Sequence, residues 1–128
     1  LIRCSPRTFL IGNGGSHANA IHICNDLILS GVKAFTLDPA TLTAIANDYG
    51  YEDTFSRWLS VVGERGDLLI ALSGSGRSPN ILRACETAEH KGMTVWREFG
   101  AAQGFDMQSS EERQIWLGHE LMRGLKCF

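Results

Sequence analysis

The stretch TFLIGNGGSHANAIHICNDLIL, residues 8–29, decides the fold, because a short apolar run passes through a glycine-rich turn into a helical pattern. Residues 8–11 predict a strand, and residues 12–16 (GNGGS) predict the turn. Over residues 17–29 the apolar side chains recur at helical spacing, namely at Ala20, Ile21, Cys24, Leu27 and Ile28. This spacing predicts an amphipathic helix that Gly31 ends. A strand that turns directly into a helix is typical of the start of a βαβ unit.

The rest of the chain repeats this alternation. Further strands are predicted at residues 33–37, 67–72 and 93–96, and further helices at residues 38–46, 54–62, 79–91 and 111–126. Asp38 followed by Pro39 is a favourable helix start, with Asp as the N-cap and Pro at the first helical position. Residues 47–53 are predicted as a loop, and residues 97–110 have little periodicity. Strands that alternate with helices indicate parallel pairing and right-handed crossovers. We therefore expect one α/β domain over residues 1–128, a three-layer open parallel sheet with about four recognisable strands.

Composition and charge exclude several classes of protein. The chain has 128 residues, of which 44% are hydrophobic and 20% charged, as in an ordinary globular protein. Twelve Lys and Arg stand against fourteen Asp and Glu, for a net charge of −2, and no basic run is present. This balance argues against direct nucleic-acid binding. The longest apolar run, residues 68–72, is far shorter than the ~20 residues that span a bilayer.

Location and redox state are predicted from similar observations. No secretory signal pattern opens the chain. The cysteines, at positions 4, 24, 85 and 127, are widely spaced and form no CxxC pair. This spacing predicts reduced, mostly packed thiols in a cytoplasmic protein.

Two glycine- and serine-rich loops, residues 12–16 and residues 73–78 (SGSGRS), each follow a predicted strand and precede a predicted helix. In open parallel sheets, ligands bind beyond the carboxyl ends of the strands. Backbone N–H groups, hydroxyls and a helix N-terminus together solvate a phosphate. The first loop is neither a GxGxxG dinucleotide fingerprint nor a P-loop. Taken alone, the first loop is compatible with a tight turn that binds nothing, and the second with a flexible Ser/Gly loop. Their joint occurrence at two strand ends predicts a phosphorylated small-molecule ligand.

The titratable side chains supply a second candidate site. His22 and Asp26 are four residues apart on one predicted helix and so share a face. His119 lies on the last predicted helix, with Glu111 two turns before it. Such a set can bind a divalent metal ion or serve as a base and an acid for proton transfer. The alternative for His22 and Asp26 is an ordinary surface pair.

Four segments carry a resemblance to a known family. They are GNGGSHANAIHICNDL at 12–27, LTAIANDYGYEDTFSR at 42–57, GDLLIALSGSGRSPNILRACETAEHKGMTV at 66–95 and, more weakly, WLGHELMRGL at 116–125. In these segments the chain resembles the sugar isomerase (SIS) domain superfamily, in its phosphoheptose isomerase branch. The resemblance implies a flavodoxin-like SIS fold. It also implies an aldose–ketose isomerase that converts sedoheptulose 7-phosphate to a heptose 7-phosphate through an enediol(ate), in a homo-oligomer that is usually a tetramer.

The same resemblance implies roles for individual residues. The sugar phosphate would be held by Ser16, Ser73, Ser75 and Ser78, with Asn13, Gly14 and Asp48 also contributing to substrate binding. A metal ion, for which Zn²⁺ is the candidate, would be held by His22, Asp26, Glu111 and His119. Asp26 and His119 would be the catalytic pair.

The chain also departs from the family pattern. The family usually has Glu at position 26 and Gln at position 111. Between Val95 and the last helix this chain is shorter, and the family's N-terminal helices are absent before Leu1, so we expect a domain shortened at both its N-terminus and its fifth-strand region. These departures favour an alternative, a noncatalytic SIS module that binds a phosphosugar or a protein partner. An incomplete reading frame is the third alternative.

Overall fold

The computed structural model describes residue 2 and residues 5–125. In chain order its elements are β1 (Thr8–Ile11), α1 (Gly15–Leu29), β2 (Ala34–Thr36), α2 (Pro39–Tyr49), the 3₁₀ helix η1 (Tyr51–Asp53), α3 (Thr54–Val62), β3 (Leu68–Ser73), α4 (Pro79–His90), β4 (Thr94–Phe99), the 3₁₀ helix η2 (Gly100–Gln103) and α5 (Met107–Leu125). No described helix is both long and apolar enough to cross a membrane.

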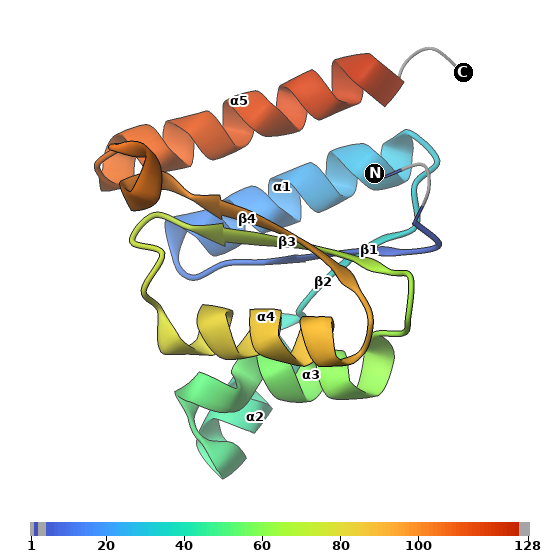
Figure 1. The fold of residues 1–128 in the computed structure, drawn as a ribbon, viewed down its shortest axis with the longest axis vertical. Helices are drawn as coiled ribbons and strands as arrows, with labels where there is room; N and C mark the ends of the chain where they lie inside the picture. Colours follow the sequence, from blue (N-terminus) through green and yellow to red (C-terminus); the bar gives the residue numbers. More distant parts are fainter. Residues whose placement is uncertain (1, 3–4, 126–128) are drawn as a thin grey trace.

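The described strands form one parallel sheet in the order β2-β1-β3-β4. The central strands β1 and β3 are fully buried and pair with Phe9 opposite Leu69 and Ile11 opposite Ala71. Figure 1 shows α1 and α5 side by side on one face of the sheet and α2, α3 and α4 on the other. The predicted three-layer α/β fold is therefore confirmed.

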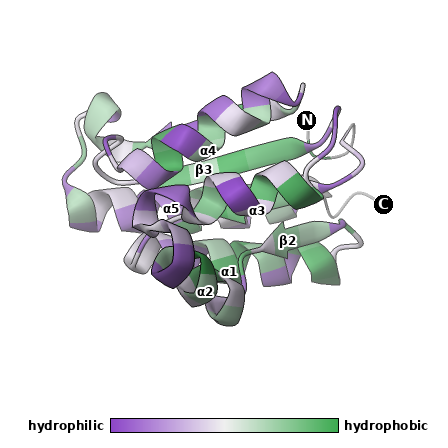
Figure 2. Cartoon of the chain, turned by 90° about the horizontal axis from the view of Figure 1, so that it is seen from below, coloured by the Kyte–Doolittle hydropathy of each residue, from purple (hydrophilic) through white to green (hydrophobic). Residues whose placement is uncertain are grey.

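Alternation along the two central strands produces two separate cores. Phe9, Leu69 and Ala71 point toward α3 and α4, where they pack against Phe55 and Ile81. The intervening side chains point to the opposite face and pack against α1; this second core contains Leu10, Leu68, Ile70 and Leu72 with Ala20, Ile23 and Leu27. Figure 2 shows β3 coloured as hydrophobic along its length, as expected for a strand that is covered on both faces.

Local signals set several helix ends as expected. The Asp38 carboxylate accepts hydrogen bonds from the N–H groups of Ala40 (2.8 Å) and Thr41 (3.4 Å), and Pro39 is the first residue of α2. Gly31 has a φ of +87°, a conformation that L side chains rarely adopt, directly after α1.

Two segments differ from the prediction. Residues 47–53 are not a loop: α2 continues to Tyr49, and η1 follows. The last side chains of α2 are exposed, and the intrinsic cost of Asn and Asp in a helix, under about 1 kcal/mol per residue, is overridden by the rest of the fold. The weakly periodic residues 97–110 contain the end of β4, then η2 and the first turn of α5. Their pattern is obscured because Glu98 is buried in β4, where it accepts hydrogen bonds from Gln103 and Arg113. No fifth strand forms among the described residues.

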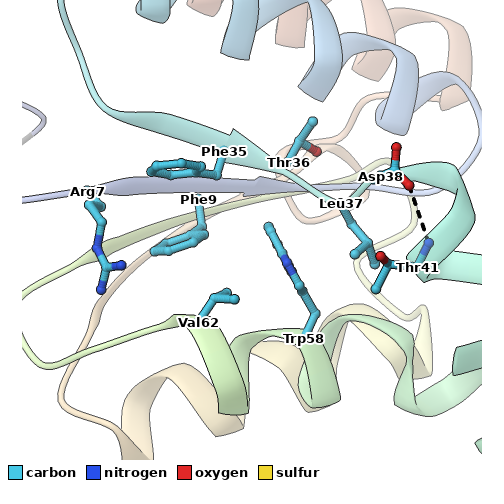
Figure 3. A pocket seen from close by; sticks show the side chains of 9 residues that line it. All are labelled: Arg7, Phe9, Phe35, Thr36, Leu37, Asp38, Thr41, Trp58 and Val62. Carbon is cyan, nitrogen blue, oxygen red and sulfur yellow. Dashed lines mark hydrogen bonds between the residues drawn. The ribbon is translucent and has the colours of Figure 1, made fainter.

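A cavity of about 270 Å³ lies beside the edge strand β2. Figure 3 shows Phe9 and Phe35 side by side on neighbouring strands, with Trp58 and Val62 rising from α3. The Phe9 ring centroid lies 5.4 Å from that of Phe35 and 5.4 Å from that of Trp58. None of the residues predicted to act on substrate lines this cavity, so the functional site must be sought at the carboxyl ends of the strands.

The central position of β3 leads to a stability prediction. We expect Leu69→Ala to lower the free energy of unfolding by about 2–5 kcal/mol, because it opens a cavity in a fully buried layer. Urea denaturation followed by circular dichroism measures this change. The control is Val61→Ala on α3, whose side chain is 82% exposed and which should change the free energy by less than about 0.5 kcal/mol. Equal effects of the two substitutions would contradict this assignment of the core.

Candidate functional site

The two glycine- and serine-rich loops lie next to each other because β1 and β3 are parallel neighbours. Between them is a cavity of about 50 Å³, lined by Asn13, Ser16, Leu72, Ser73, Gly74, Ser75, Ser78 and Met107. One ordered water needs roughly 10–15 Å³ by this measure. The cavity therefore has room for a group of several heavy atoms, such as a phosphoryl group. It brings together Asn13 and all four serines predicted to bind phosphate.

The second loop is held by its own hydroxyls. The Ser73 hydroxyl oxygen accepts a hydrogen bond from the Gly76 N–H (2.9 Å), and that of Ser75 accepts one from the Arg77 N–H (3.1 Å). Because each hydroxyl acts as an acceptor in these bonds, its own hydrogen is still available for donation. Ser78 precedes α4 and makes no capping bond with its side chain. The loop thus offers hydroxyl donors to the cavity without needing a lysine.

Helix N-termini add positive potential to the same cavity. Ser16 is the second residue of α1, Ser78 is the N-cap of α4, and Met107 begins α5; all three line the cavity. Each helix N-terminus carries unpaired N–H groups and a partial positive charge. Convergence of three such ends favours an anionic ligand, while the carboxylates of Glu111 and Asp106 at the starts of α1 and α5 offset part of this potential.

Gln114, which the sequence reasoning missed, joins α5 to the first loop. This buried side chain donates to the Ser16 hydroxyl oxygen (3.1 Å) and accepts from the Asn19 amide (2.9 Å). The Asn19 amide also donates to the Glu111 carbonyl oxygen (3.0 Å). The available signal was a glutamine in the same helical register as the apolar residues Leu117 and Leu121. These bonds set the alignment of α5 along α1.

That alignment brings together three of the four predicted metal ligands. The Nε2 atoms of His22 and His119 are 3.4 Å apart, and His22 Nε2 lies 3.3 Å from Asp26 Oδ2. One ligand atom from each of the three residues lies within 4.8 Å of the others. They face a hollow of about 450 Å³ on the outer side of α1 and α5. We call this group the His-Asp-His cluster.

Glu111, predicted as a fourth ligand, does not join the cluster. Its carboxylate lies where a side chain at Gly15 would otherwise be, at the start of α1. Eight helical residues separate it from His119, about 12 Å along the axis of α5. A carboxylate is also favoured at the positive end of a helix, which explains its position. The structure therefore gathers three of the four predicted ligands, and the Glu111 carboxylate lies apart from them.

The remaining predicted binding residues are placed less centrally. Asp48 is exposed in the last turn of α2, accepts a hydrogen bond from the Asn47 amide (3.1 Å) and does not line the cavity. Gly14, the N-cap of α1, is exposed with a φ of +55°. Two residues that were not predicted, Tyr51 and Asn80, hydrogen-bond to Asn13.

The His17 imidazole is packed rather than exposed. Its ring centroid lies 6.4 Å from that of Phe55, and both ring nitrogens are buried without a hydrogen-bond partner among the described residues. Burial lowers the pKa of His17 below its ordinary value of 6.5, because the charged imidazolium loses hydration.

The lowered pKa of His17 predicts an acid-sensitive stability. As pH falls below about 6.5, the unfolded chain binds a proton before the folded chain does, so the free energy of unfolding decreases until pH reaches the folded-state pKa. Chemical denaturation between pH 7 and pH 5 should show a shallower decrease for His17→Gln than for the parent chain. The exposed residue His90, replaced in the same way, is the control. Identical slopes for the parent and His17→Gln would contradict the prediction.

Comparison with known proteins agrees with this geometry. Residues 2–96 match the SIS domain family. Phosphoheptose isomerase from Burkholderia pseudomallei is 39% identical over 139 aligned residues, which cover 94% of this chain and 70% of that protein. The enzyme of the same name from Sodalis glossinidius is 40% identical over 115 residues, 84% of this chain and 59% of that protein.

Solved structures show the same relationship. The phosphoheptose isomerase structure from Neisseria gonorrhoeae superimposes with a TM-score of 0.88 at 27% identity, over 95% of this chain and 77% of that one. The one from Francisella tularensis superimposes with a TM-score of 0.86, also at 27% identity, over 98% of this chain and 79% of that one. The chain therefore belongs to the SIS domain family, in its phosphoheptose isomerase branch.

Proposed function

We propose that this chain is an isomerase that interconverts sedoheptulose 7-phosphate and a heptose 7-phosphate. The observation that carries the proposal is the pairing of a phosphate-sized cavity with the His-Asp-His cluster on the same two helices. Ser16 in the cavity and His22 in the cluster are six residues apart on α1, about 9 Å along its axis. A seven-carbon sugar phosphate carries its phosphate and its carbonyl region near opposite ends, which suits two separated sites.

Phosphate binding in this proposal uses neutral donors. The phosphate oxygens are bound by the helix N-termini and by the hydroxyls of Ser16, Ser73, Ser75 and Ser78. Asn13 and Gly14, in the first loop, also contribute to substrate binding. Arg77, the cation within the second loop, is exposed and does not line the cavity. Asp48 stays a predicted sugar contact, since it lies outside the cavity.

The isomerisation requires a base and an acid at adjacent carbons. A base removes a proton from C1 of the ketose while the C2 carbonyl oxygen gains one, which gives an enediol. The enediol then gains a proton at C2 while the C1 oxygen loses its proton, which gives the aldose. Asp26 and His119 are the proposed pair, because they approach each other from separate helices and face the same hollow.

The His-Asp-His cluster also fits a zinc ion. With Zn–N bonds of roughly 2.0–2.1 Å, two ligands at a tetrahedral centre lie about 3.3 Å apart. Two of the three separations, 3.4 Å and 3.3 Å from His22 Nε2, match this spacing, and the third, between Asp26 and His119, is within 4.8 Å. Nitrogen and oxygen donors suit Zn²⁺. When bound, zinc would supply Lewis-acid polarisation of the substrate's oxygens. Three protein ligands leave a fourth position open.

Assembly and location complete the proposal. The outer faces of α1 and α5 expose large apolar side chains, including Leu29 (77% exposed) and Trp116 (52% exposed). Such surface supports assembly into a homo-oligomer, for which the family resemblance implies a tetramer. Phosphosugar substrate, cytoplasmic location and absence of nucleic-acid binding remain the sequence-based predictions.

Deuterium exchange tests the chemistry directly. The purified protein is incubated with sedoheptulose 7-phosphate in D₂O, with and without added zinc, and deuterium uptake at C1 and C2 is followed by NMR. We expect His119→Ala to slow exchange by about 10²–10⁴-fold, the usual contribution of a general acid or base. The control His90→Ala, on an exposed histidine at the end of α4, should exchange at the parent rate.

The outcomes separate the candidate functions. Parent-like exchange in His119→Ala would overturn the catalytic assignment. A parent protein that binds the sugar phosphate saturably but never exchanges its protons would be a noncatalytic binding module. The displacement of Glu111 from the His-Asp-His cluster is the observation that favours this second candidate.

Zinc binding is predicted separately. We expect isothermal titration calorimetry to show that His22→Ala weakens Zn²⁺ binding by more than about tenfold, since loss of even an outer-shell partner costs 10–100-fold. Glu111→Gln is the matched control and should bind zinc like the parent, because its carboxylate lies at Gly15. A large loss of zinc affinity in Glu111→Gln would restore it as a ligand.

A further inference from the structure

A chain of hydrogen bonds runs from the core to Asn13 in the cavity. Asn13 lines the cavity in the first loop, and Asn80 is buried in the first turn of α4. Their side-chain amides pair reciprocally: Asn13 Nδ2 donates to Asn80 Oδ1 (2.8 Å), and Asn80 Nδ2 donates to Asn13 Oδ1 (2.9 Å). This pair bridges two segments that are 67 residues apart.

Thr54 fixes the direction of this chain. Its fully buried hydroxyl donates its single hydrogen to the Tyr51 carbonyl oxygen (2.9 Å), so toward Asn80 it can only accept. Asn80 Nδ2 lies 3.3 Å away and donates to it. A reversed Asn80 amide would place its acceptor oxygen against the Thr54 hydroxyl oxygen, whose hydrogen is already donated to Tyr51, and this buried contact would then have no donor, which is costly. Asn80 must therefore present its oxygen to the Asn13 amide nitrogen.

The orientation of the Asn13 amide is also fixed by its hydrogen-bond partners. Its Oδ1 accepts from Asn80 Nδ2 and from the Tyr51 hydroxyl (2.8 Å), which uses both lone pairs. One of its two N–H groups is given to Asn80. A single N–H donor is all that remains of the Asn13 side chain for a ligand.

We propose that Tyr51 and Asn80 are positioning residues that make Asn13 a donor-only contact, which recognises an acceptor oxygen of the phosphosugar. This inference rests on the proposed function and extends it, because it assigns the polarity of one contact and the residues that set it. Neither Tyr51 nor Asn80 lines the cavity, so both act through Asn13.

The test is a double-mutant cycle on ligand binding. Tyr51→Phe removes the hydroxyl from a ring that is 52% exposed, so the fold is not at risk. Isothermal titration with sedoheptulose 7-phosphate should show about two- to tenfold weaker binding, the usual effect of one hydrogen bond, with kcat of the isomerisation nearly unchanged. In an Asn13→Ala background the same substitution should have no further effect.

Tyr49→Phe is the matched control. Tyr49 is also exposed and lies two residues away. Its ring packs under the Arg57 guanidinium, whose carbon is 3.4 Å from the ring centroid, and takes no part in the hydrogen bonds to Asn13. We expect parent-like binding. Asn13→Asp, which replaces the free donor with an acceptor, should weaken binding more than Asn13→Ala does.

The results that would contradict the positioning role differ from those that would contradict the proposed isomerase activity. An equal effect of Tyr51→Phe with and without Asn13 would overturn the positioning role, as would Asn13→Asp binding as well as the parent. Inorganic phosphate is the second probe. If Tyr51→Phe weakens its binding to the same extent, the acceptor oxygen belongs to the phosphate; unchanged phosphate binding assigns the acceptor oxygen to the sugar. If the parent protein binds the sugar phosphate but does not isomerise it, the double-mutant cycle on binding still tests the positioning role. If the parent protein does not bind the sugar phosphate at all, the positioning role is overturned.

Discussion

The parallel pairing of β1 with β3 is the constraint on which the site depends. Both strands are buried on two faces, so their register is fixed by the cores above and below the sheet. Because they run in the same direction, the loops that follow them emerge at one edge, and the helices that follow those loops begin there. The position of the phosphate-sized cavity thus follows from the topology of the sheet, and the serines and glycines of the two loops supply its polar lining.

The second half of the site depends on how α5 lies along α1. Gln114 bonds to Ser16 and Asn19, so the two helices run parallel with their N-termini at the same edge. This alignment puts His119 opposite His22, where their ring nitrogens meet. A one-residue slip of α5 would turn His119 by about 100° away from α1, so a buried glutamine maintains the geometry of an exposed cluster.

The sequence was sufficient for the features that depend on local pattern. The strand and helix order, the Asp38 cap and the clustering of both glycine- and serine-rich loops follow from periodicity, turn chemistry and parallel topology. Features that depend on distant partners could not be predicted. A charged residue such as Glu98 is expected at the surface, but in the fold it is buried and pairs with Arg113. Glu111 was assigned as a ligand from the resemblance, and the fold puts its carboxylate at Gly15 instead. The Asn13–Asn80 pair joins segments 67 residues apart. The resemblance named the His-Asp-His residues, but only the fold shows which of them meet.

The position of α5 also bears on how the molecule is made. During translation the described strands and both loops are complete once Phe99 has been added, and α5 follows them. Because a domain generally folds as one unit, these strands and loops are made before the helix that they pack against. Met107 of that helix lines the cavity, so a ligand bound there would stabilise the state in which α5 is docked on α1.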